Sequence, residues 1–319
     1  MRSSFPTRRA DAGESSVRRR AGAWAVAAAA AAAAVVAGCG PDGGPTAAHL
    51  HLAPAGTSLG QPDEVIAGPQ GNTPQFVADC EFSHAAQDDP IVHPGKPGAS
   101  HLHVFFGNPD VDAFTVAADL VDGNTTCDQP LDRAAYWAPA LLRDGEVLTP
   151  TRGVAYYRPG VGIDHRLVEP YPPGLVMVAG NPSAVAPQPL SIVAWGCGAG
   201  AARSATPIEC AESRPLRLIV TFPDCWDGER LDSADHHSHV AYSTGGACPA
   251  SHPVHVPQLQ FEVEYPAWGP VDGLVLASGG VLTGHADFMN GWVQSKLAQE
   301  VAVCLNRGIV CGVVSGRGE

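Results

Sequence analysis

Histidine and aspartate are concentrated in one part of this chain, residues 224–256. That stretch contains five histidines and four aspartates, namely His236, His237, His239, His252, His255, Asp224, Asp227, Asp232 and Asp235. Two segments far away in sequence add His101, His103, His285 and Asp287. Imidazole and carboxylate are the side chains that most readily transfer protons and bind metal ions near neutral pH. We therefore expect one site assembled from these three segments.

The first of these segments alternates imidazoles with apolar residues. His101 and His103 flank Leu102, and Val104 follows. Successive side chains of a strand point to opposite faces, so both imidazoles would lie on one face of a sheet. Such a pair is suited to metal chelation or to paired proton transfer. The alternative is two histidines that are satisfied by hydrogen bonds at the end of a sheet.

The segment 235–239 supports two geometries. His236 and His239 are three residues apart, so one helical turn would bring them together. In an extended segment His237 and His239 would pair instead. In both cases Asp235 would lie beside an imidazole and orient it. The alternative is a histidine-rich loop without a defined partner.

The remaining candidates are carboxylates beside histidine or cysteine. His285 and Asp287 share one side of an extended segment, where a base with its orienting carboxylate, or two metal ligands, would lie. Asp227 follows Cys225, and a disulfide there would hold its carboxylate in place for catalysis, although aspartate before glycine also marks a turn. The candidate catalytic residues are His101, His103, Asp227, His236, His239, His285 and Asp287. The candidate ligands of a divalent metal ion are His101, His103, His239 and His285.

Motifs of other enzyme classes are absent from the sequence. There is no G-x-S-x-G elbow, P-loop or dinucleotide-binding fingerprint. Glu262 and Glu264 alternate like a glycosidase carboxylate pair, but we interpret them as residues of a solvated strand face. The sequence therefore indicates a histidine and aspartate site, acting by hydrolysis or elimination if it is catalytic.

Short strands separated by proline and glycine turns would position these residues. Strands are predicted at 102–106, 154–157, 190–195, 216–222 and 258–265. In the last of these, alternate apolar residues predict a buried face and a polar outer face. A helix is predicted over 290–305, with Asn290 as its N-cap. The predicted fold is β-rich, mainly antiparallel and sandwich-like or α+β, with one C-terminal helix.

The N-terminus has the pattern of an export signal. Arg18, Arg19 and Arg20 precede an apolar run over 21–36, and Cys39 ends a segment that resembles a bacterial lipobox. An ordinary signal peptide or a transmembrane anchor is the alternative, for which the run is short. We predict a signal peptide (1–38), a lipidated Cys39 with a flexible linker (39–73), one domain (74–312) and a tail (313–319). The protein would be exported and anchored by lipid to the outer face of the cytoplasmic membrane.

The charge balance excludes one class of partner. The chain has a net charge of −13. Residues 1–38 hold six arginines and two acidic residues, so the remainder has 13 Lys and Arg against 30 Asp and Glu, a net charge of −17. Nucleic-acid binding needs a basic surface, so no nucleic-acid partner is expected.

Eight cysteines remain when Cys39 is set aside. They are Cys80, Cys127, Cys197, Cys210, Cys225, Cys248, Cys304 and Cys311. An even number in an exported chain predicts disulfides, and no closely spaced pair indicates a zinc or iron–sulfur site. Among roughly a hundred pairings we predict sequential ones, with Cys304–Cys311 as the most plausible loop.

Several sequence blocks occur together in the order of a known family. They are Asp89-Pro-Ile-Val92, Pro94-Gly-Lys-Pro97, Ser100-His-Leu-His103, Phe106-Gly-Asn108, Tyr136-Trp-Ala-Pro-Ala140, Pro172-Pro-Gly174, Met177-Val-Ala-Gly-Asn-Pro182, Cys225-Trp-Asp-Gly228, Leu231-Asp-Ser233, Asp235-His-His-Ser-His-Val-Ala-Tyr242, Cys248-Pro249, Ser251-His-Pro-Val254, Pro257-Gln-Leu259, His285-Ala-Asp-Phe288 and Asn290-Gly-Trp292. The chain thereby resembles the domain-of-unknown-function family DUF1996 of secreted fungal and bacterial proteins, from Phe76 to about Trp292. In that family lysine often occupies the position of His237, so His237 is a weaker candidate for a site residue. Fungal relatives often carry carbohydrate-binding modules, and this implies a role near extracellular polysaccharide.

Overall fold

Two five-stranded antiparallel sheets form the frame of the protein, whose computed structural model describes residues 73–198 and 202–311. The predicted signal peptide, Cys39, the linker before Thr73 and the C-terminal tail lie outside the described residues. Among the described residues, no helix has the length and apolarity that a membrane span requires.

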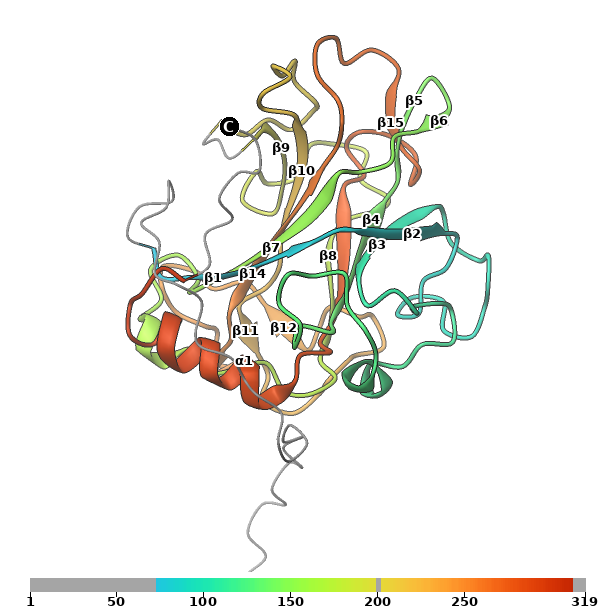
Figure 1. Cartoon of the computed structure of the whole chain (residues 1–319). Coiled ribbons are helices and arrows are strands. Elements are labelled where there is room, and N and C mark those ends of the chain that lie inside the picture. The colour runs from blue at the N-terminus through green and yellow to red at the C-terminus, as the bar shows by residue number, and fades with distance from the viewer. Residues whose placement is uncertain (1–72, 199–201, 312–319) are drawn as a thin grey trace, which may run out of the picture. The chain divides into compact units, whose positions relative to one another are not determined.

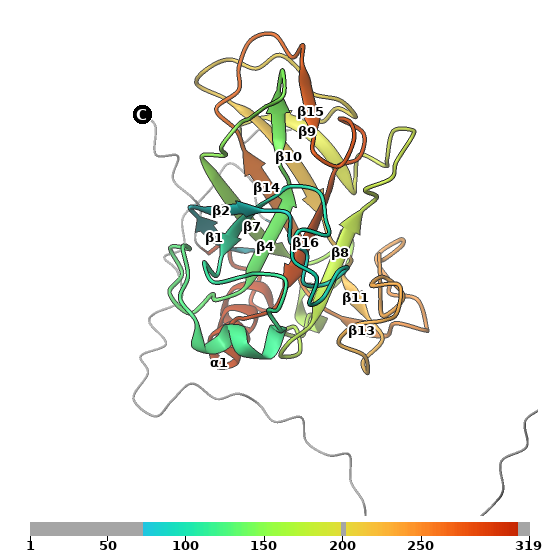
Figure 2. The same cartoon turned by 90° about the vertical axis from the view of Figure 1, so that its right-hand side faces the viewer.

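The strands of each sheet come from distant parts of the sequence. The first sheet has the order β1 (Phe76–Cys80), β7 (Arg152–Arg158), β14 (Gln258–Glu264), β10 (Leu216–Thr221) and β9 (Val193–Cys197). The second has the order β2 (Phe82–Ala86), β3 (His103–Gly107), β4 (Ala135–Pro139), β16 (His285–Met289) and β8 (Val176–Gly180). Figures 1 and 2 show both sheets, and the strand pairs within them are antiparallel.

The two sheets pack face to face around an aromatic core. Phe261 of β14 contacts Phe106 of β3 and Tyr136 of β4, with ring centroids 5.5 and 5.2 Å apart. Gly153 of β7 permits this contact, because a Cβ there would lie 2.7 Å from the ring of Phe261 and 2.9 Å from that of Phe106. The predicted β-rich, antiparallel, sandwich-like fold is confirmed.

Shorter elements complete the described structure. Two three-stranded sheets have the orders β12 (Val240–Ala241), β11 (Cys225–Trp226), β13 (Val254–His255) and β15 (Leu274–Leu276), β5 (Leu141–Arg143), β6 (Glu146–Val147). The 3-10 helices are Ala117–Asp122 and His165–Leu167, the α-helix α1 is Gln294–Glu300, and a π-helix follows at Val301–Leu305.

The predicted C-terminal helix exists but begins later than expected. Asn290 is not its N-cap, because α1 begins at Gln294 and Val293 occupies the cap position. The Asn290 side chain is engaged elsewhere: its amide donates to the carbonyl of Pro172 (2.8 Å), and its Oδ1 accepts from the backbone N–H of Trp292 (3.3 Å). These contacts keep the chain non-helical for one turn longer than periodicity indicates.

The outer face of β14 is buried, which corrects the prediction of a solvated polar face. Glu262 and Glu264 are only 5 and 8% exposed. Arg217 of β10 lies across from them, with Nη1 2.8 Å from Glu262 Oε2 and Nε 2.9 Å from Glu264 Oε2. The sequence shows that polar and apolar residues alternate in β14. It does not show the pairing with Arg217, which lies 45 residues from Glu262 in sequence.

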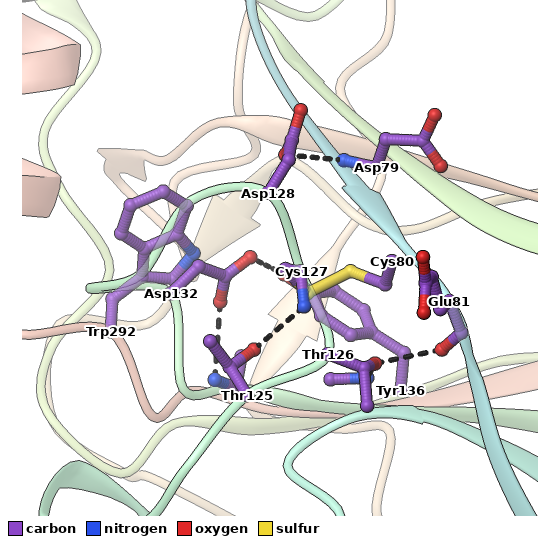
Figure 3. The surroundings of a disulfide bond; sticks show 12 residues. Asp79, Cys80, Glu81, Thr125, Thr126, Cys127, Asp128, Asp132, Tyr136 and Trp292 are labelled. Carbon is purple, nitrogen blue, oxygen red and sulfur yellow. Dashed lines mark hydrogen bonds between the residues drawn. A yellow bond between two sulfur atoms is a disulfide. The ribbon is translucent and has the colours of Figure 1, made fainter. Parts of the chain in front are cut away.

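The predicted sequential disulfide pairing is confirmed. The pairs are Cys80–Cys127, Cys197–Cys210, Cys225–Cys248 and Cys304–Cys311. The first pair lies beside a buried polar chain (Figure 3): Asp132 accepts a hydrogen bond from the hydroxyl of Tyr136, which is also bonded to the hydroxyl of Tyr157. Burial raises the pKa of Asp132 to about 7.

Candidate metal centre

The outer face of the second sheet carries three of the predicted histidines. His103 opens β3 opposite Pro139 of β4, and His285 opens β16 on the other side of β4. His101 lies two residues before His103 and therefore on the same side of the chain. The intervening residues behave as the alternation predicts: Val104 belongs to the core between the sheets, and Leu102 packs against it.

The three imidazoles form one compact group. Ring centroids are 4.2 Å apart for His101 and His103, 4.9 Å for His101 and His285, and 5.8 Å for His103 and His285. One ring nitrogen from each lies within 4.8 Å of the other two. That spacing allows a single ion to be bound by all three, since a zinc–imidazole bond is about 2 Å long.

Backbone hydrogen bonds orient two of the rings. Nδ1 of His103 donates to the carbonyl of Asp88 (3.0 Å), and Nδ1 of His285 donates to the carbonyl of Thr283 (2.9 Å). A carbonyl only accepts, so in each neutral ring the proton is on Nδ1 and the lone pair is on Nε2. Metal-binding histidines in proteins are held in this way by a partner on the other ring nitrogen.

The lone pairs of the group are left without hydrogen-bond donors. Nε2 of His101 and Nε2 of His103 are buried, and neither has a partner among the described residues. His103 and His285 are 0 and 3% exposed, so the group reaches solvent mainly along His101. Buried polar atoms without partners are costly. A bound cation would satisfy them.

The protonation state favours metal binding. Burial lowers the pKa of His101 and that of His285 to about 4, and it lowers the pKa of His103 well below its usual value. Neighbouring imidazoles act in the same direction. All three rings are therefore neutral near pH 7, which is the form that binds metal ions.

The other groups with metal-like spacing contain disulfides. Three further clusters among the described residues are Cys225–Cys248–His255, Cys80–Cys127–Asp132 and Glu300–Cys304–Cys311. In each cluster the two cysteines form a disulfide with each other. A disulfide does not provide the thiolates that bind metals. In the part of the chain that is described, the three-histidine group is therefore the candidate centre.

One family matches the sequence across this centre. The match is to the family described as Domain of unknown function (DUF1996), and it covers residues 89–292, more than half of the chain. The chain belongs to the DUF1996 family. No curated protein and no solved structure matches it. The matched part of the DUF1996 domain contains His101, His103 and His285.

A buried carboxyl group lies next to the histidines in the DUF1996 domain. Asp287 follows His285 by two residues in β16, on the same face, opposite Trp137 of β4. It is 1% exposed, and neither carboxyl oxygen has a hydrogen-bond partner among the described residues. Burial, followed by the charge of Asp89, raises the pKa of Asp287 well above its usual value. Burial therefore favours the protonated, neutral form of this carboxyl group.

His93 is a neighbour that the sequence interpretation missed. When protonated, its charge would lower the pKa of His101, His103 and Asp89, so His93 lies within electrostatic range of the group. It lies in the proline-rich loop before His101, whose backbone at Asp88 also accepts the bond from His103. Such a loop has no regular period, so spacing does not reveal which way His93 faces. Its position eight residues before His101 is the only signal in the sequence.

The histidine-rich segment 235–239 does not join the three-histidine group. His239 is buried, but its Nδ1 is bonded to the hydroxyl of Ser233 (2.9 Å) and its Nε2 to the carbonyl of Val176 (2.7 Å). No lone pair remains for a metal. His236 adopts a left-handed backbone conformation (φ 56°) and lies 3.0 Å from the carboxylate of Asp232. Its charge lowers the pKa of Asp89, so it lies near the loop beside the centre.

Asp227 holds a turn. Its Oδ1 accepts the backbone N–H groups of Glu229 and Arg230, both at 2.9 Å, and its Oδ2 is 2.7 Å from Nε of Arg230. The turn interpretation of an aspartate before Gly228 therefore describes its contacts, and the structure does not bring it to the three histidines.

Proposed function

We propose that this DUF1996 domain binds a divalent transition-metal ion through His101, His103 and His285 and that it is an exported enzyme acting on extracellular polysaccharide by hydrolysis or elimination. The observation that carries the proposal is the set of three neutral imidazoles with inward ring nitrogens, two of them oriented by backbone carbonyls. Ligands that are all imidazole suit zinc, copper or nickel.

Three protein ligands leave a coordination position open, as in catalytic zinc sites. A metal bound there would polarise a substrate oxygen or activate water. Asp287 supplies a neutral carboxyl group on the same sheet face, and we assign it the transfer of a proton to the leaving oxygen. A cavity of about 420 Å³ lies on this side of the sheet, at the end of β16 away from His285, and is lined by Ile91, Val176 and Met289.

The four disulfides support the exported location, because such bonds persist in oxidising compartments. We propose anchoring by a lipid on Cys39. A Cys39→Ser variant expressed in a bacterial host should move from the membrane fraction to the soluble exported fraction. A variant that stays in the membrane fraction would contradict the lipid anchor.

The alternative is a module that binds metal or glycan without turnover, and the deep burial of His103 and His285 favours it over an open catalytic cleft. A panel of acidic and neutral polysaccharides separates the two. Release of reducing ends or of unsaturated products should stop after chelation, return after metal is added back, and be lost in His103→Ala while glycan binding remains. Turnover that persists in both conditions would exclude the proposed enzyme centre.

A further inference from the structure

A second cavity, of about 1270 Å³, lies on the opposite side of the sandwich from the three histidines. Gln258 and Gln260 of β14 and Thr221 of β10 line it. These residues alternate with Leu259 and Val220, which belong to the core between the sheets. The cavity therefore opens on the outer face of the first sheet, and its chemistry is independent of the proposed metal centre.

Two guanidinium groups converge on this cavity. Nε of Arg158 donates to Oε1 of Gln75 (2.9 Å), and Nη2 of Arg203 donates to Oε1 of Gln260 (2.6 Å). All hydrogen-bond acceptors of the two arginines in the described part of the chain are neutral oxygens, including the carbonyl of Leu190. Both arginines line the cavity. Burial lowers the pKa of Arg158, the charges of Glu262 and Tyr156 raise it, and the charge of Arg203 lowers it.

Two carboxylates near the cavity form no hydrogen bond with either arginine in the described part of the chain. Asp224 lies against Gly160 and accepts from the backbone N–H of Ser243 (2.8 Å). Glu262 interacts with Arg158 through its charge, but its Oε2 is bonded to Arg217 and its Oε1 accepts from the amide of Gln260. In a chain with a net charge of −13, two arginines without a bonded carboxylate are an unusual concentration of positive charge. An anion would complete their pairing.

Unmet hydrogen-bonding groups point to the same ligand. Arg158, His165 and Thr221 line the cavity, and each has a buried atom without a partner among the described residues, namely Nη2, Nδ1 and Oγ1. Each of them is costly unless a ligand or water bonds to it. Three such atoms around one cavity indicate a ligand with several polar groups.

The wall of the cavity is set by a close contact between two loops. A Cβ on Gly246 would lie 2.5 Å from the carbonyl oxygen of Gly162, and both glycines have positive φ (80°). Side chains at these positions would push the loops apart. The contact brings the loop that follows Arg158 against the loop that follows Tyr242, and residues of both loops line the cavity.

We propose that this cavity binds an acidic saccharide, with a carboxylate between Arg158 and Arg203. A carboxylate matches the two guanidiniums, and sugar hydroxyls match the side chains of Gln258, Thr221 and His165. The volume exceeds what an inorganic anion fills and lies above the roughly 300–1,000 Å³ of typical small-molecule pockets, so a saccharide has room in it.

Isothermal titration calorimetry of the exported protein with trigalacturonate tests this proposal. Arg203→Gln and Arg158→Gln should each weaken binding at least tenfold. Arg203 is exposed, so its variant keeps the fold, and the exposed Arg214, which donates to the carbonyl of Cys197, provides the control Arg214→Gln with unchanged affinity. Binding should weaken as salt is added.

Two further probes make the outcome decisive. Neutral maltotriose should not bind, because it has no carboxylate. Phosphate that binds as tightly as trigalacturonate would overturn the saccharide assignment in favour of a simple anion site. Absence of heat with trigalacturonate, or an affinity of Arg203→Gln and Arg158→Gln equal to that of the wild type, would overturn the site itself. None of these results depends on metal in the protein.

Discussion

The hydrogen bonds from His103 to Asp88 and from His285 to Thr283 determine what the three-histidine group can do. They place the ring proton on the side away from His101, so the opposite nitrogen presents a lone pair. His239 is the contrasting case, because both of its ring nitrogens are already bonded. Burial of a histidine is therefore not sufficient for metal binding in this protein. The difference is the hydroxyl of Ser233, which occupies the second ring nitrogen of His239.

Metal-dependent thermal stability should distinguish these two kinds of histidine. At a metal concentration about 100 times Kd the gain is about 2.7 kcal/mol, or roughly 5–10 °C in Tm for a domain of this size. His285→Gln should lose that gain because a ligand is removed. His239→Gln should keep it, whatever its effect on the metal-free protein. Differential scanning calorimetry with and without zinc measures both. The reverse pattern, with the gain lost only in His239→Gln, would refute the assignment of ligands.

At the scale of elements, a buried hydrogen-bond chain joins β4 and β7 to the segment before α1. The indole N–H of Trp292 donates to the hydroxyl of Tyr157 (3.0 Å), which is bonded to Tyr136, which donates to Asp132. The backbone N–H of Ala134 also donates to Asp132 (3.1 Å). The chain ends on a carboxyl group that is completely buried. Burial outweighs these bonds and raises the pKa of Asp132 to about 7.

This raised pKa predicts a loss of stability as the pH increases. Between the unfolded pKa of Asp132, 3.8, and the folded value of about 7, the native state binds more protons, so the free energy of unfolding falls with rising pH. The change is on the order of 4 kcal/mol at most. Urea unfolding measured from pH 4 to pH 8 tests this. The free energy of unfolding of the wild type minus that of Asp132→Asn should fall by that order as the pH rises toward 7. Parallel curves would show that Asp132 does not titrate in this range.

Sequence patterns predicted the strands and the helix better than the tertiary contacts around them. Alternation in 258–265 and in 102–106 identified β14 and β3, because the side-chain period of a strand is local. The burial of Glu262 and Glu264 depends on Arg217, and the start of α1 depends on Pro172 bonding Asn290, and both partners are distant in sequence. His101, His103 and His285 were predicted as one site together with His239. That His239 lies apart, and that His93 lies near the group, followed only from the fold.

At the scale of the whole molecule, the disulfides differ in what they constrain. Cys80–Cys127 spans 47 residues and encloses the segment that carries His101 and His103, whereas Cys304–Cys311 spans 7 residues near the C-terminus. The first bond thus ties the proposed metal centre to the first sheet through β1. Loop-closure entropy predicts that removal costs about 4 kcal/mol for the long loop and about 2 kcal/mol for the short one.

Paired serine substitutions test this difference. The Cys80→Ser/Cys127→Ser protein should be less stable to urea than the Cys304→Ser/Cys311→Ser protein by about 2 kcal/mol, and it alone should bind zinc more weakly. Equal zinc affinity in the two proteins would indicate that the strands, and not the disulfide, hold the histidines in place.

The central claim is that His101, His103 and His285 bind a metal ion, and elemental analysis by mass spectrometry tests it most directly. The protein, prepared without an affinity tag or refolding, should contain near one equivalent of zinc, copper or nickel. The double variant His101→Ala/His103→Ala should contain none, and His237→Ala should retain the full amount. Wild-type protein that stays metal-free after dialysis against each ion, or a double variant that keeps its metal, would contradict the claim.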